Sequence, residues 1–282
     1  MKFKVFSELT YEVSSTTTFI FNIQAARTNN QYILEESIVT TPILNFQEFS
    51  IINSEARFIR MEVNAGITFT ITYNAVVDVY HTIVTGEQLG NKVPVMQLDP
   101  VAIPYLFPSR HCQSDKLTKL AQKEFGHLEN AYSQASAVNE WIYSHIEYLS
   151  GTTNSGTSAY DTLTQREGVC KDFAHLGIAL CRALDIPARY FTGYACDLVP
   201  PDFHACFEAY IGGQWMFFDA TKLVPVNGLV KIANSKDAAE AAVASYFGNS
   251  ICTYMNIQCE PAEPGFIPYI LVTGKMEGIS YR

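Results

Sequence analysis

Hydrophobic and polar positions alternate with a period of two residues over most of the first 90 residues. Apolar side chains recur at every second position in segments 19–23 and 67–73, and three threonines occupy the opposite face of the second segment. This is the pattern of half-buried β-strands. Turn-like breaks separate such runs at 27–30, 53–54 and 64–66. The pattern therefore predicts a small antiparallel β-sandwich at the amino-terminal end.

The pattern changes after residue 86. Residues 86–110 are rich in Gly, Pro and Asn, which is typical of a connector running over a surface. Beyond the connector the spacing becomes helical and then mixed. We therefore expect an α+β protein with a β-sandwich domain over 1–95, a connector over 96–114 and a second domain over 115–282. Within the second domain the patterns predict helices at 131–148, 169–184 and 236–247, strands at 188–194, 203–211 and 215–220, and a final apolar run at 266–272.

The predicted helix at 169–184 carries a cysteine in its first turn. A loop-like stretch rich in Gly, Thr, Ser and Asn precedes it, so Cys170 comes directly where the helix begins. Unpaired backbone amides and the helix dipole at this position favour a thiolate. The helical row that continues from Cys170 through Ala174, Gly177 and Cys181 is small throughout, so a neighbouring strand can approach that side closely.

The segment 203–221 predicts a β-hairpin that turns at Gly212-Gly213. If these glycines form a two-residue loop, Cys206 lies opposite Asp219 on the partner strand. His204 is then a diagonal neighbour of Asp219 on the same face. A carboxylate placed in this way can orient the imidazole ring.

Cys170, His204 and Asp219 together predict a nucleophile, a base and an orienting acid. In such a triad the His deprotonates the thiol, while the Asp holds the tautomer and stabilises the imidazolium. The chemistry is acyl transfer through a thioester. Glu208, on the same strand face as His204, is the weaker candidate for the orienting acid.

Other cysteines and histidines are better explained by packing. A cysteine within a helix more often serves as a small apolar residue than as a nucleophile, and we expect this of Cys181. The adjacent pair His111-Cys112 diverges on either a strand or a helix, and we assign it to the domain junction. His175 lies on a different helical row from Cys170.

Charge and composition exclude several classes of protein. The formal charge is −9 and the sequence has no Lys/Arg-rich block, so we expect no nucleic-acid partner. Neither a signal-peptide core nor an apolar run of membrane-spanning length occurs, which predicts a cytoplasmic protein without a membrane partner. The seven cysteines are scattered and form no CxxC pair, so we expect neither a disulfide framework nor a metal site.

Three segments carry a resemblance to a known family. They are GVCKDFAHLGIALCRALDIPARYFTGY (168–194), PDFHACFEAY (201–210) and GGQWMFFDAT (212–221). They resemble the transglutaminase-like superfamily of papain-like cysteine enzymes in its bacterial branch, and YLFPSRHCQSD (105–115) resembles the junction segment of that branch. The resemblance implies an amino-terminal β-sandwich followed by a papain-like domain, in which a Cys-bearing helix packs on an antiparallel sheet bearing His and Asp.

The resemblance also implies a reaction. Members of the family attack an amide carbonyl with a thiolate and require no metal or organic cofactor. We expect a cysteine-dependent amide hydrolase, a protease or peptidase, acting on a peptide or protein amide. Transfer of the acyl group to an amine acceptor, as in a protein-glutamine acyltransferase, is the alternative. A third possibility is a peptide-binding module of the same fold without catalysis.

Residues around the triad are expected to complete the cleft. The backbone N–H of Cys170 and a second donor, assigned to Gln165, would form the oxyanion hole. Gly168 would permit close approach of backbone or substrate. Three aromatic residues are candidates for the cleft walls: Tyr160, Phe203 and Trp215.

Overall fold

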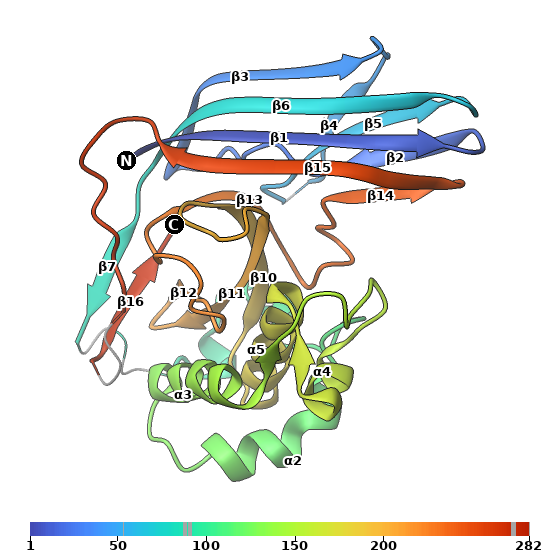
Figure 1. Ribbon diagram of the computed structural model, residues 1–282. Helices are drawn as coiled ribbons and strands as arrows, with labels where there is room; N and C mark the ends of the chain where they lie inside the picture. Colours follow the sequence, from blue (N-terminus) through green and yellow to red (C-terminus); the bar gives the residue numbers. More distant parts are fainter. Residues whose placement is uncertain (53, 87–88, 90–91, 272–274, 282) are drawn as a thin grey trace.

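The protein combines a two-sheet β-sandwich with a second body of helices and sheet (Figure 1). The computed structural model describes residues 1–52, 54–86, 89, 92–271 and 275–281. Three predicted features therefore lie partly outside the described residues: the break at 53–54, the connector at 86–110 and the apolar run at 266–272. The α+β fold class is confirmed.

The first sandwich sheet has the strand order β15-β1-β6-β3, all antiparallel. Its strands are β1 (Lys2–Val13), β3 (Gln31–Thr41), β6 (Thr68–Val79) and β15 (Ser250–Pro261). The second sheet has the order β14-β2-β5-β4. Its strands are β2 (Thr17–Phe21), β4 (Gln47–Ser50), β5 (Arg57–Val63) and β14 (Ala244–Phe247).

Aromatic side chains join the two sandwich sheets. Tyr11 and Phe69, from the first sheet, lie with their ring centroids 5.0–6.4 Å from those of Phe19 and Phe21 in the second. The period-two pattern of the amino-terminal region places exactly these residue types on the inner faces, since alternate side chains point to one side of a strand. The predicted β-sandwich is therefore present.

The third sheet belongs to the second body and has the strand order β13-β10-β11-β12-β16-β7. Its strands are β7 (Thr82–Thr85), β10 (Ala188–Ala195), β11 (Phe203–Ile211), β12 (Gln214–Phe218), β13 (Leu229–Ser235) and β16 (Glu277–Ser280). Two short strands, β8 (Glu147–Tyr148) and β9 (Glu167–Gly168), pair in parallel. The connector contributes two 3₁₀ turns, η1 (Val95–Gln97) and η2 (Ile103–Tyr105).

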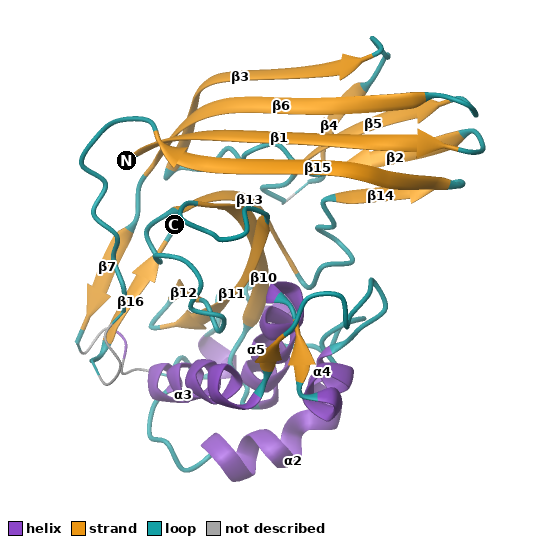
Figure 2. Cartoon of the chain, viewed as in Figure 1, coloured by secondary structure: helices purple, strands orange, loops and turns teal. Residues whose placement is uncertain are grey.

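Four helices gather at the end of the molecule away from the sandwich (Figure 2). They are α2 (Ser114–Phe125), α3 (Ala131–His145), α4 (Ala159–Gln165) and α5 (Cys170–Ala183). Helix α5 packs on β11 at Gly177, where an added Cβ would lie 2.5 Å from the Phe207 ring. The row of small residues on this helix is therefore the side that a strand approaches, as predicted.

The two bodies exchange strands, so the expected ranges 1–95 and 115–282 do not coincide with the sheets. Strands β14 and β15, late in the chain, complete the two sandwich sheets, whereas β7 pairs with β16 in the third sheet. The physical reason is that β1 and β2 each need a partner on their remaining edge, and the sequence pattern within 1–95 does not reveal which distant segment supplies it.

Two helix predictions need correction. The segment 236–247 is not a helix, because residues 244–247 form β14 and pair with β2. Its alanine content favours a helix locally, but pairing with the free edge of β2 overrides that weak preference. The predicted helix 131–148 ends at His145, and Glu147–Tyr148 pairs with β9 instead.

Candidate active site

Cys170 is the first residue of α5 and is partly exposed. The Asp172 carboxylate accepts a hydrogen bond from the Val169 N–H at 3.0 Å and another from the Thr153 hydroxyl at 2.8 Å. These bonds fold the loop back onto the helix start, so the chain enters α5 in one defined direction. The Cys170 Sγ lies 4.0 Å from the carbonyl oxygen of Phe203 on β11.

The hairpin of β11 and β12 brings His204 and Asp219 together. Ile211 pairs with Gln214 and Phe207 with Phe218, which is the register that the Gly212-Gly213 turn predicts. The His204 Nε2 lies 2.9 Å from the Asp219 Oδ2. His204 is 1% exposed and Asp219 is 5% exposed, so this hydrogen bond is screened from water.

The second oxygen of Asp219 is also held in place. Asp219 Oδ1 accepts hydrogen bonds from the Thr221 N–H at 2.9 Å and from the Thr221 hydroxyl at 2.7 Å. Burial raises the pKa of Asp219, but His204 and Thr221 lower it by a larger amount, so the net pKa falls below the ordinary 3.8. The carboxylate is therefore ionised and fixed in orientation.

The charge on His204 follows from its neighbours. Burial lowers the pKa of His204, but the Asp219 carboxylate and the side chain of Cys170 raise it by more, and the net pKa is well above 6.5. Nε2 is engaged by Asp219, whereas the buried Nδ1 has no hydrogen-bond partner among the described residues. Nδ1 is therefore the ring nitrogen left to serve the thiol of Cys170.

Two other cysteines of the second body are fully buried, and one of them, Cys206, lies beside His204 and Asp219. Burial raises the pKa of Cys181 and of Cys206 to about 12, which keeps both as thiols. The ligand atoms of His204, Cys206 and Asp219 lie within 4.8 Å of one another. A metal ion bound by all three would compete with the hydrogen bond between His204 and Asp219, because that bond already uses their facing atoms.

Tyr148 is a site residue that the sequence reasoning missed. Burial and Cys170 raise the pKa of Tyr148 to about 12, while His204 and the nearby Cys170 backbone N–H act in the opposite direction. Tyr148 reaches this place because β8 pairs with β9, with Tyr148 opposite Gly168. No local signal marks the residue, since it stands in what reads as the end of a helix.

The predicted cleft residues lie at different distances from Cys170 and in different surroundings. The Phe203 carbonyl lies beside Cys170, whereas Gln165 is an exposed residue at the end of α4. Gly168 is needed by the protein itself, because an added Cβ would lie 2.8 Å from the Cβ of Asp172. Tyr160 is exposed, with the Lys116 ammonium 5.4 Å from its ring centroid.

Trp215 lies near the turn end of the hairpin, away from the triad. It pairs with Tyr210, and the Arg189 guanidinium stacks on its ring at 4.2 Å. Its predicted place in the cleft wall is therefore wrong, because the hairpin register puts it on the packed end of β12. Glu208 is likewise engaged elsewhere, bonded to Arg189 at 2.6 Å and to Asn234 at 3.0 Å.

The two other histidines considered from the sequence, His111 and His175, have structural partners. His111 stacks on His175 with ring centroids 5.0 Å apart, and its backbone N–H donates to Asp237. His175 Nε2 accepts a hydrogen bond from the Ala238 N–H, and burial lowers the pKa of His175 to about 3. Both residues therefore belong to packing between the helices and the segment after β13.

Comparison with known proteins identifies the class of protein to which this fold and this candidate site belong. Residues 1–101 match the family model described as bacterial transglutaminase, N-terminal domain, and residues 118–220 match the transglutaminase-like superfamily. The chain belongs to the transglutaminase-like superfamily, as the resemblance of its motifs predicts.

Individual relatives extend this result. A crystal structure of "a Putative Cysteine Protease" from Cytophaga hutchinsonii is 56% identical, with a TM-score of 0.98, and the match covers 100% of this chain and 98% of that one. An uncharacterized protein of Mycobacterium leprae is 31% identical over 114 residues, which is 38% of this chain and 41% of that protein. The chain thus spans less than half the length of this mycobacterial relative. Within the described residues, no helix is long and apolar enough to cross a membrane.

Proposed function

We propose that the protein is a cysteine-dependent amide hydrolase, a protease or peptidase with Cys170, His204 and Asp219 as its catalytic triad. The observation that carries the proposal is the state of His204. Its Nε2 is bound to an ionised carboxylate, its pKa is raised, and its Nδ1 is buried without a hydrogen-bond partner among the described residues. An imidazolium held in this way stabilises a thiolate on Cys170.

The first half-reaction follows from these positions. The Cys170 thiolate attacks the amide carbonyl carbon, and a bond forms between carbon and sulfur. The negative charge that develops on the carbonyl oxygen is stabilised by the Cys170 backbone N–H and by the Tyr148 hydroxyl. His204 then donates its proton to the amine nitrogen as the C–N bond breaks, which leaves a thioester on Cys170.

In the second half-reaction, His204 removes a proton from water, and the resulting hydroxide attacks the thioester carbonyl. The C–S bond breaks, the acid is released and the thiolate is restored. Cys170 is partly exposed, so water has access to the thioester, and this favours hydrolysis. The name of the Cytophaga hutchinsonii relative also agrees with hydrolysis.

The proposal is tested on the reduced protein with casein as substrate. Hydrolysis predicts new amino termini, or ammonia if side-chain amides react, and predicts their loss in His204→Ala. The same reaction with dansylcadaverine tests the alternative, since an acyltransferase would attach the amine to casein. Absence of both products, together with slow iodoacetamide labelling of Cys170, would favour the third possibility of a binding module.

We also propose that the protein works in a reducing compartment such as the cytoplasm. All seven cysteines are free thiols, among them the exposed Cys252. Thiol titration of protein isolated from its native cells under acid quench checks this proposal. Seven titrating thiols are expected, and a disulfide would contradict it.

A further inference from the structure

The sandwich has an open side next to the second body. Strands β14 and β15 are edge strands of the two sandwich sheets, and they follow one another in the chain on the side facing the third sheet (Figure 1). Residues of both strands line a cavity of about 540 Å³. We call it the edge groove, and its lining residues are drawn from β1, the start of β11, β14 with its preceding residue, and β15.

The edge groove presents an uncovered apolar surface. Met255 pairs with Leu9 across the two strands, so both side chains lie on the inner face of the first sheet. Leu9 is 2% exposed, whereas Met255 is 46% exposed. An apolar side chain on the inner face of a sheet is ordinarily covered, and its exposure here leaves room for an apolar group from another molecule.

The groove continues into the candidate active site. Asp202 and Phe203 line it, and the Phe203 carbonyl lies 4.0 Å from the Cys170 Sγ. The Asp202 carboxylate interacts electrostatically with both His204 and Tyr148. The groove therefore reaches the residue whose carbonyl faces the candidate thiol, although Cys170 itself does not line it.

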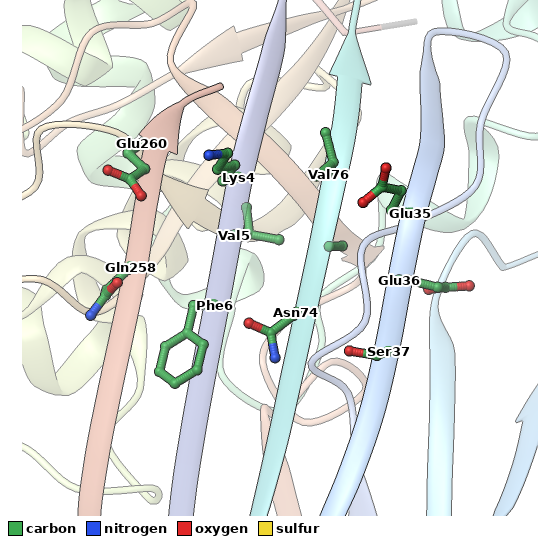
Figure 3. A pocket seen from close by; sticks show the side chains of 11 residues that line it. Lys4, Val5, Phe6, Glu35, Glu36, Ser37, Asn74, Val76, Gln258 and Glu260 are labelled. Carbon is green, nitrogen blue, oxygen red and sulfur yellow. The ribbon is translucent and has the colours of Figure 1, made fainter. Parts of the chain in front are cut away.

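Another hollow on the sandwich lacks this connection. It lies on the outer face of the first sheet, with a volume of about 390 Å³, and its lining is rich in polar groups such as Lys4, Glu35 and Glu260 (Figure 3). None of its lining residues comes from the second body. The edge groove thus differs from this outer hollow in two ways: it has an apolar floor, and its lining includes residues of the second body.

We infer that the edge groove binds apolar side chains of the polypeptide that carries the reacting amide. The inference rests on the proposed function, because it takes Cys170 as the nucleophile. An extended polypeptide is the occupant that fits, since edge strands offer unpaired backbone groups to a further strand and alternate side chains of that strand would point into the groove. The sandwich then selects the substrate, while the second body performs the reaction.

The experiment uses three alkylating probes on the full-length reduced protein. Iodoacetamide has no peptide part, so its rate of reaction at Cys170 measures the reactivity of the thiol without any contribution from the groove. The peptides acetyl-Leu-Leu-Gly and acetyl-Ser-Ser-Gly, each ending in a chloromethyl ketone, react by the same displacement: the thiolate forms a C–S bond and chloride leaves. Mass spectrometry locates the label, and the ratio of the Leu-Leu to the Ser-Ser rate constant at Cys170 measures occupation of the groove by apolar side chains.

We expect this ratio to be about tenfold in the wild-type protein, as a modest apolar subsite gives. In Met255→Lys the ratio should fall to about one, because a charge replaces the apolar floor. Ile251→Lys is the matched control: Ile251 is on the same strand, opposite Glu12 on the outer face, and is 60% exposed. Its ratio should equal that of the wild type.

The possible results distinguish a failure of the groove from a failure of the proposed function. Fast iodoacetamide labelling of Cys170 combined with a wild-type ratio near one overturns the groove and leaves the proposed function standing. Equal loss of the ratio in Met255→Lys and Ile251→Lys also overturns it. Slow iodoacetamide labelling of Cys170 in the wild type overturns the proposed function and the groove together.

Discussion

The two ends of the β11–β12 hairpin each hold a charged pair of low exposure, and the two pairs differ in how their charged groups are bonded. Near the turn, Arg189 donates to the Glu208 carboxylate and also stacks on Trp215, and Asn234 donates to the same carboxylate. At the open end, His204 and Asp219 are bonded to each other, but the buried His204 Nδ1 has no partner among the described residues.

This difference separates a structural pair from one prepared for chemistry. The Glu208 carboxylate is bonded to both Arg189 and Asn234, and removal of a partner from such a pair leaves an uncompensated charge. A pair with one unsatisfied ring nitrogen next to a thiol carries a desolvation cost that proton exchange with the thiol relieves. Changes at the open end should therefore abolish activity, whereas changes at the turn end should lower stability and leave the reactivity of Cys170 nearly unchanged.

The largest effect is expected from loss of the nucleophile or the base. Cys170→Ala and His204→Ala should each lower kcat/KM for the amide reaction by roughly 10⁴-fold or more, because members of a triad act as a unit. Initial rates with casein measure this change. Cys181→Ala is the matched control on the same helix and should retain nearly full turnover; full turnover in His204→Ala would exclude the triad.

Asp219→Asn should lower kcat by roughly 10³-fold, because the asparagine no longer stabilises the imidazolium. The pH dependence gives a second readout. In the wild type the pKa of His204 is raised above 6.5, partly by Asp219, and NMR of the imidazole ring as a function of pH follows its protonation. In Asp219→Asn the pKa of His204 should fall, and an unchanged His204 titration would contradict the assigned role of Asp219.

The same pair makes a pH-dependent contribution to the free energy of unfolding. The pKa of His204 is raised on folding, so its stabilisation is fully present below the unfolded value of about 6.5 and is lost as the pH rises through the folded pKa. Urea unfolding of the wild type and His204→Gln should therefore show a larger stability difference at pH 6 than at pH 10. A difference that grows with pH would contradict the raised pKa.

Tyr148→Phe should lower kcat by about 10²-fold with little change in KM, as loss of one oxyanion donor does. The aromatic ring remains, so packing against Phe173 is kept. Tyr143→Phe, at an exposed position on the neighbouring α3, is the matched control and should have wild-type kcat. Equal kcat in the two variants would remove Tyr148 from the mechanism.

The smallest effect on chemistry is expected at the turn end. Glu208→Gln should lower the free energy of unfolding by about 3 kcal/mol, because Arg189, whose side chain is only 11% exposed, loses its counterion. The rate constant for labelling Cys170 in the folded protein should stay within about twofold of the wild type. Chemical denaturation and iodoacetamide labelling measure the two quantities, and a large loss of labelling rate without loss of stability would reverse the comparison.

Local sequence was sufficient for the parts of the site that depend on one element or one turn. The Gly212-Gly213 loop determines which residues of the hairpin face each other, so the approach of His204 and Asp219 could be predicted. The start of α5 at Cys170 followed in the same way from the loop composition before it and the apolar periodicity after it.

Only the tertiary structure decided what depends on distant pairing. Tyr148 reaches Cys170 through the pairing of β8 with β9, and the late strands β14 and β15 complete a sandwich that begins at the amino terminus. Neither has a signal in its own segment, because backbone pairing depends on which edge is free and not on side-chain identity. The sequence thus determined the candidate triad, while the folded chain decided what surrounds it.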